Sequence, residues 1–509
     1  MSPTRRIAFA TTALVALAPL AARAQQVFQP GNLVISRSIY QTPGNTITVG
    51  QALPGGGIAT SDASFPSVFN NETPDPSFGI TSPIILDQVT TSGALVNTQT
   101  LTGIVTSFPS KSEEALNLSA DGSKLNFIDY AAPLNALDVS NSNTPNHVDS
   151  TNPVQLTYQR EVGTLSATGA LSLQAVDAYS GNNGRAAITG AKGVTYLAGN
   201  AGNGTKNATA ATLTDQGLNG GIQIVVPGQA ETTSAGRFSP NPAIAGDKPS
   251  KDTNFRGLTI FNNTLYTTKG SGGNRINTVY QVGTAGTLPG PGTGNTISVL
   301  PGFTTTPASG TAGTVQYFPF GLFFADANTL YVADEGNGTI TDTNAGIEKW
   351  SLVGGVWVQD YTLQANLFGT YTLNGTTFET TGLRNLTGTV NGDGTVSLYA
   401  VTATGGAKGV FGYNDQGADA NEVVAINDLL ASTTLPTTPE PYTPIEAPTF
   451  ENVYRGISEA PSPVPEPASL TCHPTILNLP VRGGCSLGNL NPPSKELGRL
   501  SPRTNGPGA

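Results

Sequence analysis

The sequence predicts an all-β protein, and more specifically a β-propeller, from three observations. Charged residues make up only 11% of the 509 residues, whereas glycine (61) and proline (37) are abundant and methionine occurs once. Long amphipathic helices need charged, helix-forming residues on their solvent face, but short strands joined by Gly-rich turns do not. A strand–turn–strand pattern also recurs along the chain, and an unpaired half-copy stands at each end of the repeated region.

Five copies of the pattern contain both strands. First strands are expected at 114–118, 185–188, 255–260, 320–324 and 384–387, and second strands at 125–128, 194–199, 265–270, 330–336 and 398–401. Between them stand the tight-turn residues Asn, Asp and Gly, as in Asn262-Asn263 and Asn391-Gly392-Asp393-Gly394, which favour hairpins. The aligned first positions recur every 64 or 71 residues, longer than a typical blade of about 40–50, so long inserted loops are expected.

The two half-copies predict how the structure closes. Arg455-Gly456-Ile457-Ser458 has no second strand after it, and residues 32–37 form a strand with no first strand before it. Joining both in one blade closes a ring and removes the exposed edges of an open sheet. The result is six blades, and a seventh would have to lie within 40–110. A β-helix or a string of β-sandwiches is the alternative, disfavoured by the irregular loops and the matching ends.

The N-terminus has the pattern of a signal peptide over residues 1–24. Arg5 and Arg6 precede an apolar run from Ile7 to Leu20, and Ala22-Arg23-Ala24 supplies a small-x-small cleavage site. The apolar run is short for a membrane span. We therefore expect export by general secretion, with twin-arginine export as the alternative.

After processing, we expect a propeller over 25–458 and a Pro/Gly-rich, disordered tail over 459–509. The chain has a net charge of −10, and its central body is more acidic than its two ends. An acidic body argues against nucleic acid and against anionic membranes as partners. Both cysteines, Cys472 and Cys485, lie in the tail, so the propeller must be stabilised by packing and strand pairing without disulfides.

One repeat resembles a known propeller type. The segment from Leu330 to Gly338 resembles the core of NHL and SMP-30-like propeller repeats. Residues 32–37, 85–87, 179–185 and 346–352 are similar to segments of large exported bacterial propeller-like proteins. This resemblance implies a fold and export to the extracellular space or cell surface, and it implies no particular activity.

The tail resembles a second family. Val464-Pro465-Glu466-Pro467-Ala468-Ser469 is similar to the start of a PEP-CTERM sorting signal, which implies processing by an exosortase and display on the surface or in the matrix. The chain departs from that family because no apolar span of about 18 residues follows the motif. No membrane span is therefore expected in the mature chain, and the protein should be released. A plain proline-rich linker, or a frameshifted remnant of the signal, is the alternative.

The aligned first position of the repeat gives a candidate ligand site. It holds Arg185, Arg256, Arg384 and Arg455, with Glu114 and Phe320 in the other two units. Residues at one repeat position form a ring in a propeller, so four guanidiniums would converge on one mouth of the central channel and bind a carboxylate, sulfate or phosphate. The alternative is that each arginine bonds carbonyls between blades, or an acid such as Glu113, Asp334 or Glu335.

Two acidic segments are candidate metal sites. The loop 414–422 contains Asp415, Asp419 and Glu422, hard oxygen ligands that would suit calcium outside the cell, although an ordinary Asx-rich turn explains it equally. Asp334 and Glu335 could serve as metal ligands in a lactonase-type site. We predict no catalytic residues, because His147 and His473 are the only histidines and the body has no cysteine nucleophile.

The sequence therefore favours a non-catalytic surface or matrix propeller that binds an extracellular glycan or protein, with no certain cofactor. A metal-dependent propeller hydrolase acting on lactones or phosphate esters is the alternative, and a purely structural matrix component is the third hypothesis.

Overall fold

The computed structural model describes residues 28–39, 50, 60–61, 69–70, 77–78, 81–107, 113–137, 139–148, 152, 154–190, 193–200, 220–238, 254–270, 276–291, 295–305, 317–373, 375–405, 419–450 and 452–463. Contacts divide the chain into two units, residues 1–464 and 465–509, and all described residues belong to the first. The predicted signal peptide, the PEP-CTERM-like motif and both cysteines lie outside the described residues.

The described chain is built almost entirely from antiparallel strands, with a single 3-10 turn at Val139–Asn141. Blade 1 contains β7 (Asn117–Leu118), β8 (Lys124–Tyr130), β9 (Arg160–Ser166) and β10 (Leu171–Val176). Blade 2 contains β11 (Gly184–Thr189), β12 (Thr195–Gly199), β13 (Ile222–Val225) and β14 (Thr232–Ser234). Blade 3 contains β16 (Phe255–Phe261), β17 (Thr264–Lys269), β18 (Thr278–Val282) and β19 (Thr296–Val299), to which the short β15 (Arg237–Phe238) adds in parallel.

Three further blades follow along the chain, and the last of them also contains the first strand. Blade 4 contains β20 (Pro319–Asp326), β21 (Thr329–Asp334), β22 (Gly346–Val353) and β23 (Val356–Leu363). Blade 5 contains β25 (Thr376–Val390), β26 (Thr395–Gly405), β27 (Val423–Leu429) and β28 (Thr443–Glu446), with β24 (Gly369–Leu373) paired to the start of β25. Blade 6 contains β29 (Asn452–Glu459), β1 (Leu33–Ile39), β5 (Thr81–Val89) and β6 (Leu95–Ser107).

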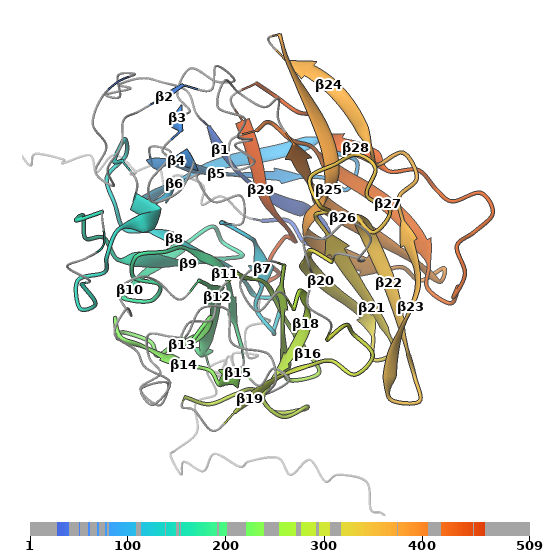
Figure 1. The fold of residues 1–509 in the computed structure, drawn as a ribbon, viewed down its shortest axis with the longest axis horizontal. Coiled ribbons are helices and arrows are strands. Elements are labelled where there is room, and N and C mark those ends of the chain that lie inside the picture. The colour runs from blue at the N-terminus through green and yellow to red at the C-terminus, as the bar shows by residue number, and fades with distance from the viewer. Residues whose placement is uncertain are drawn as a thin grey trace, which may run out of the picture. The chain divides into compact units, whose positions relative to one another are not determined.

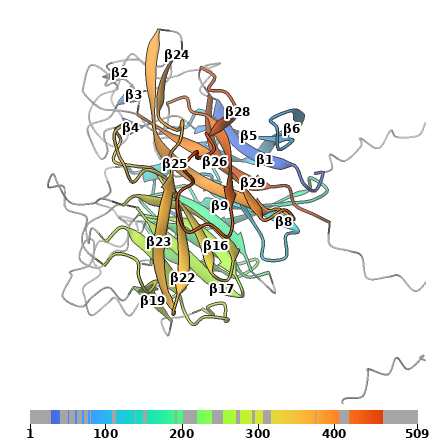
Figure 2. The ribbon, with the colours of Figure 1, turned by 90° about the vertical axis from the view of Figure 1, so that its right-hand side faces the viewer.

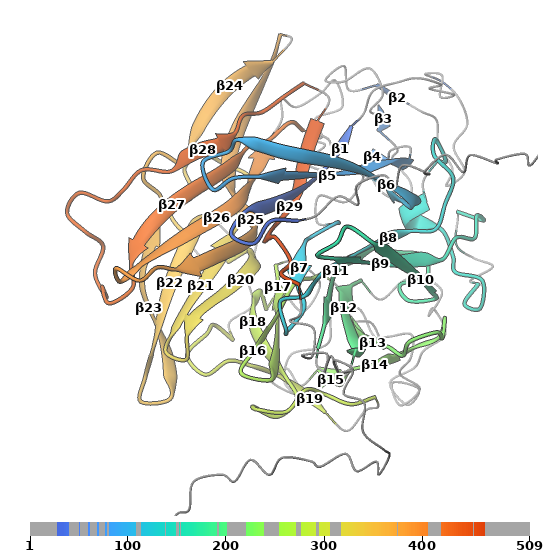
Figure 3. The same cartoon turned by 180° about the vertical axis from the view of Figure 1, so that it is seen from behind.

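The closing blade confirms the prediction that the two half-copies pair. β1 runs antiparallel to β29, from Leu33 opposite Glu459 to Ile39 opposite Asn452, and Figure 3 shows the two strands side by side. Blades 6 and 1 form one continuous sheet by hydrogen bonding, but they are joined through a single pairing, Val105 with Tyr130.

The inner strands contact one another in a ring. β7 contacts β11, and contacts continue through β16, β20, β25 and β29 back to β7. Figure 1 shows the sheets following one another around this centre. The fold is thus a β-propeller, and the described strands divide into six blades. Within the region 40–110, the described strands are β5, β6 and a small sheet of β2 (Thr60–Ser61), β3 (Phe69–Asn70) and β4 (Ser77–Phe78), not a seventh blade.

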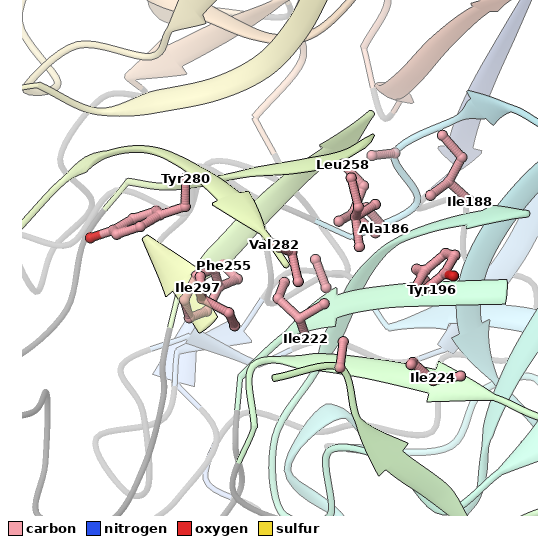
Figure 4. Close-up of a cluster of buried hydrophobic side chains, with 14 of the residues drawn as sticks. Ala186, Ile188, Tyr196, Ile222, Ile224, Phe255, Leu258, Tyr280, Val282 and Ile297 are labelled. Carbon is pink, nitrogen blue, oxygen red and sulfur yellow. The ribbon is translucent and has the colours of Figure 1, made fainter. Parts of the chain in front are cut away.

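The hydrophobic core lies between blades rather than at the centre. Six clusters of buried apolar side chains each join one neighbouring pair of blades, so that every sheet is covered on both faces. Figure 4 shows the cluster between blades 2 and 3, in which Ile222 of β13 approaches Phe255 and Val282 of blade 3. Stacking in a ring buries both faces of sheets that could not bury them alone.

Small residues let the inner strands approach one another closely. A Cβ at Gly321 would lie 2.6 Å from the carbonyl oxygen of Arg384, and one at Gly456 would lie 2.5 Å from that of Glu114. The residue after the aligned first position is therefore glycine or alanine in five units, Asn385 being the exception. Asn385 instead accepts a hydrogen bond from the Ile457 amide at 2.6 Å with its side-chain oxygen.

The two edges of the propeller differ in their connections. Every inner strand begins, and every second strand ends, at one edge, where long stretches of sequence separate the second strand from the third, as between Ile39 and Thr81 or between Tyr130 and Arg160. At the other edge most turns are short, although 283–295 and 430–442 are longer. Asn262 and Asn263 alone join β16 to β17, both at positive φ. We call these the long-loop edge and the short-turn edge.

Two details of blade 5 differ from the sequence prediction. β25 begins at Thr376, eight residues before the predicted Arg384, because its first part pairs with β24 as a separate hairpin. Figure 2 shows this hairpin projecting beyond the other strands of the blade. The Thr/Pro-rich segment 431–450 also contains β28, a strand that the repeat pattern did not predict and that supplies the fourth strand.

Candidate functional site

Charged side chains from all six blades meet at the long-loop edge, around the inner strands. The arginines predicted to form a ring are all buried there, with exposed fractions of 6% for Arg185, 3% for Arg256 and Arg384, and 4% for Arg455. They lie near enough for their charges to interact, Arg185 with Arg256 and Arg384 with both Arg256 and Arg455. We call the arginines, with the four acids described below, the central charge cluster.

One half of this cluster is closed by ion pairs. Glu335 follows the end of β21 in blade 4 and forms ion pairs with Arg256 of blade 3 and, at 3.4 Å, with Nε of Arg384 of blade 5. The Arg256 guanidinium also stacks over the ring of Phe320, 5.2 Å from its centroid. These contacts agree with the alternative to a ligand-binding ring that the sequence left open, in which an arginine bonds an acid such as Glu335. We call Arg256, Glu335 and Arg384 the closed half.

The opposite half lies around blade 1 and contains more acid than base. Glu113 and Glu114 stand just before β7, Asp129 lies near the end of β8, and the arginines of blades 2 and 6 flank them. Nε of Arg455 lies 3.9 Å from Glu114 and donates to Ser38 at 3.0 Å. We call Glu113, Glu114, Asp129, Arg185 and Arg455 the open half.

Several polar atoms of the open half lack hydrogen-bond partners within the described chain. By geometry they include both carboxylate oxygens of Glu114 and of Asp129, one oxygen of Glu113, and Nε and Nη1 of Arg185. The hydroxyl groups of Ser36 and Thr106 nevertheless lie near enough to Glu114, and that of Thr106 near enough to Asp129, to lower the pKa of each carboxyl. Glu113 accepts a hydrogen bond from the Tyr130 hydroxyl with its other oxygen. Buried polar groups are normally paired, so unmet acceptors and donors facing one centre are the usual mark of a site that takes water or a ligand.

Burial sets the protonation of these acids. It raises the pKa of Glu113 to about 7, opposed by the charges of Arg455 and Arg185, and that of Glu114 to about 8, opposed by Arg455. Burial and the charges of Glu114 and Glu113 raise the pKa of Asp129 well above its usual value. Burial and the charge of Arg256 lower the pKa of Arg185 to about 9. The acids can therefore both donate and accept hydrogen bonds near neutral pH.

Three members of this site were not predicted from the sequence as site residues: Asp129, Tyr130 and Arg160. Arg160, at the start of β9, is fully buried, and its guanidinium donates to the carbonyl oxygens of Tyr158, Ser140 and Ser142 at 2.8–3.0 Å. Asp129 and Tyr130 stand at the end of the second strand of blade 1, at the positions that Asp334 and Glu335 hold at the end of the second strand of blade 4. Extending the repeat alignment to the ends of the second strands would have identified them.

The described residues among the predicted metal ligands fall on two segments, one at the end of β21 and one just before β27. Asp334 is buried and accepts hydrogen bonds from the amides of Phe318 and Gly336, both at 2.7 Å. Asp419 is buried and Glu422 half-buried beside β27, while Asp415 lies outside the described residues. Among the described residues, no group of three or more His, Cys, Asp or Glu side chains is arranged to hold a metal ion. Calcium binding stays a prediction.

Comparison with known proteins gives no family. No family model matches the chain, and no curated protein matches it. Among solved structures, a hypothetical selenium-binding protein from Sulfolobus tokodaii is similar, with a TM-score of 0.37 and 9% identity over 86% of this chain and 96% of that one. The parainfluenza virus 5 hemagglutinin-neuraminidase ectodomain has a TM-score of 0.33 and 10% identity, covering 77% and 88%. NanB sialidase from Streptococcus pneumoniae has a TM-score of 0.33 and 9% identity, covering 76% and 68%.

These likenesses are too distant to carry a functional argument, and the propeller assignment rests on the strand pairing and the ring of inner strands. Within the described ranges, we find no helix long and apolar enough to cross a membrane.

Proposed function

We propose that this protein is an exported propeller of the cell surface or extracellular matrix that binds an acidic glycan without catalysis. The observation that carries the proposal is the open half of the central charge cluster. Arg185 offers a buried guanidinium with two unpartnered donor atoms, which suits a carboxylate or sulfate group. The neighbouring carboxyls of Glu113, Glu114 and Asp129 suit sugar hydroxyls, which both donate and accept hydrogen bonds.

The remaining features of the proposal come from the sequence alone. The signal-peptide pattern of residues 1–24 supports export, the NHL/SMP-30-like repeat supports a binding propeller, and the PEP-CTERM-like motif supports exosortase processing. A protein ligand that presents an acidic side chain would use the same guanidinium, and the binding screen below separates it from a glycan.

The alternative of a metal-dependent hydrolase has less support. The oxygens of Asp334 and Glu335 are already used by backbone amides and by two arginines. A catalytic metal needs several ligands and an open coordination position. A hydrolase would lose activity with a chelator, whereas the binding protein proposed here would be indifferent to it.

The test is a binding measurement with residues 25–463 and a galacturonate tetrasaccharide as the probe, using a galactose tetrasaccharide as the neutral control. We expect saturable binding of the acidic probe, unchanged by chelator and without cleavage of the probe. Arg185→Gln should weaken binding at least about tenfold, as expected for a lost charged hydrogen bond of roughly 1.5–3 kcal/mol. Lys124→Gln, at an exposed position of β8, is the matched control and should bind as the parent does.

Equal binding of the neutral probe, or full binding by Arg185→Gln, would contradict the proposal. Cleavage of the acidic probe would replace it by a hydrolase or lyase. Binding of an acidic peptide in place of the glycan would change the ligand class and keep the site.

A further inference from the structure

A cavity lies between blades 3 and 4. Its walls are largely apolar and aromatic, and three buried polar side chains line it: Glu348 of β22, Thr278 at the start of β18, and Asn277 just before it. The remaining lining residues are Val279, Phe303, Thr304, Tyr317, Pro319, Val332 and Trp350. None of these belongs to the central charge cluster.

Each of these three buried side chains has one oxygen without a hydrogen-bond partner in the described chain. Glu348 is 2% exposed; its Oε2 accepts a hydrogen bond from Trp350 Nε1 at 2.8 Å, and its Oε1 has no hydrogen-bond partner in the described chain. The side-chain oxygens of Asn277, 4% exposed, and Thr278, 2% exposed, also lack partners there. Three oxygens without a donor call for a group that carries several N–H or O–H donors.

The surrounding charges favour a cation. The charged groups that act on Glu348 are Asp334 and Asp342, both acids, and burial with these charges raises its pKa well above the usual value. The raised pKa favours the protonated, neutral form of Glu348, so a cation that binds here displaces that proton and pairs with the carboxylate that forms. Trp350, stacked on Phe303 with 4.0 Å between the ring centroids, forms an aromatic wall, and its indole N–H holds the Glu348 carboxyl group in place.

The size and walls of the cavity select the kind of cation. Its volume of about 10 Å³ accommodates one group of the size of water. A calcium ion would need six to eight oxygen ligands. An ammonium group needs only three hydrogen-bond acceptors, and its alkyl chain can pack against apolar side chains. Thr304 and Tyr317 are half-buried, so the stem can leave the cavity on their side.

We propose that this cavity binds the terminal ammonium group of a primary alkylamine, held by Glu348, Asn277 and Thr278 against Trp350. The amine is either free or the side chain of a lysine in an extracellular protein. The two sources share one chemistry and differ only in what is attached beyond the stem.

Tryptophan fluorescence gives a direct readout, because the chain has only two tryptophans and one of them, Trp350, lines the cavity. The variant Trp357→Phe leaves Trp350 as the single reporter. Titration with n-butylammonium chloride should change its emission saturably. Nα-acetyl-lysine methylamide, tested in parallel, identifies a peptide lysine as the source if it binds more tightly, and a free amine if it binds more weakly. Butanol and tetramethylammonium are controls that lack either the charge or the N–H donors, and they should not bind.

Glu348→Gln keeps the shape of the side chain and the acceptor for Trp350, and it should weaken butylammonium binding at least tenfold. Thr278→Val, which removes one acceptor at constant volume, provides a second variant should the first fail to fold. Glu161→Gln on blade 1 is the matched control and should bind normally. Equal responses to butanol and butylammonium, or unchanged binding by both Glu348→Gln and Thr278→Val, would overturn the proposal.

Discussion

Two buried clusters of charge lie in this propeller, and they are built in opposite ways. Between blades 4 and 5, Lys349 of β22 and Asp428 of β27 form an ion pair at 2.8 Å with both side chains at most 1% exposed. Tyr331 and Tyr361 donate to the Asp428 carboxylate at 2.6 and 2.8 Å, and Lys349 also bonds Tyr361 and the Leu429 carbonyl. Each charged group has partners there, whereas in the open half of the central charge cluster seven polar atoms lack a hydrogen-bond partner within the described chain.

The difference indicates what each cluster is for. Burying charges is costly, and a protein recovers that cost only when each charged atom finds partners of good geometry. The Lys349–Asp428 cluster meets that condition with its own residues and joins two blades. The open half does not meet it, which is the expected state of a site that completes its hydrogen bonds with a ligand.

Breaking the satisfied cluster should have the largest effect on stability. Asp428→Asn leaves Lys349 as a buried charge without its counter-ion, so we expect the free energy of unfolding to fall by about 3–5 kcal/mol. Urea unfolding followed by fluorescence measures it. The double variant Lys349→Met with Asp428→Asn removes both charges and should lose less than the single variant. A loss below about 1 kcal/mol in Asp428→Asn would show that the two clusters do not differ as argued.

The closed half of the central charge cluster should respond next most strongly. Glu335→Gln removes the one acid that pairs with both Arg256 and Arg384. We expect a loss of about 2–3 kcal/mol, because two buried guanidiniums keep an amide oxygen as acceptor but lose their counter-charge. Thermal unfolding compared with the parent gives the value, and an unchanged melting temperature would contradict the assignment of these residues as the closed half.

Changing pH tests the acids of the open half without any mutation. Because burial raises the pKa of Glu113 to about 7 and of Glu114 to about 8 in the folded protein, their protonated forms favour folding. Stability should be greatest near pH 4.5 and should fall as the pH rises to about 8, by on the order of 2 kcal/mol. Asp334, whose pKa burial raises to about 7, acts in the same direction. Denaturant midpoints measured from pH 4.5 to 8.5 follow this trend, and a rise in stability over that range would refute it.

The smallest effect on stability should come from the open half itself. Arg185→Met removes a buried guanidinium whose Nε and Nη1 have no partner, so its loss should change the free energy of unfolding by less than about 1 kcal/mol while abolishing binding of the acidic glycan. Unfolding and binding of the acidic glycan, both measured on Arg185→Met and on the parent protein, test this prediction. If Arg185→Met were destabilised as much as Asp428→Asn, the result would show that Arg185 stabilises the fold.

The sequence predicted the ring better than it predicted the contacts within it. The repeat phase set by Arg185, Arg256 and Arg455 identified the inner strands, and the unpaired strand at 32–37 identified the closing blade, because a propeller repeats one local pattern. The repeat pattern did not predict whether an arginine would form an ion pair with an acid, since Glu335 comes from the second strand of a different blade. Local patterns record strand and turn, whereas pairing across blades depends on the packing angle between sheets.

The same limit explains the members that were missed. Asp129 and Tyr130 end a strand whose sequence reads as an ordinary buried strand, and Arg160 lies beyond a long connection, at the start of the next strand. Glu348 alternates correctly within β22 and shows nothing unusual in sequence. The Glu348 oxygen without a hydrogen-bond partner belongs to a cavity that Asn277 and Thr278 of the neighbouring blade also line. No spacing along the sequence connects those two residues to Glu348.

The central claim is that Arg185 and the surrounding carboxyls hold an acidic sugar at the centre of the propeller. A crystal structure of residues 25–463 grown with the galacturonate tetrasaccharide tests it most directly. The account predicts a sugar carboxylate within about 3 Å of the Arg185 guanidinium, with hydroxyl groups bonded to Glu114 or Asp129. A structure in which Arg185 is paired with another residue of the chain, and the sugar is absent or bound elsewhere, would contradict it.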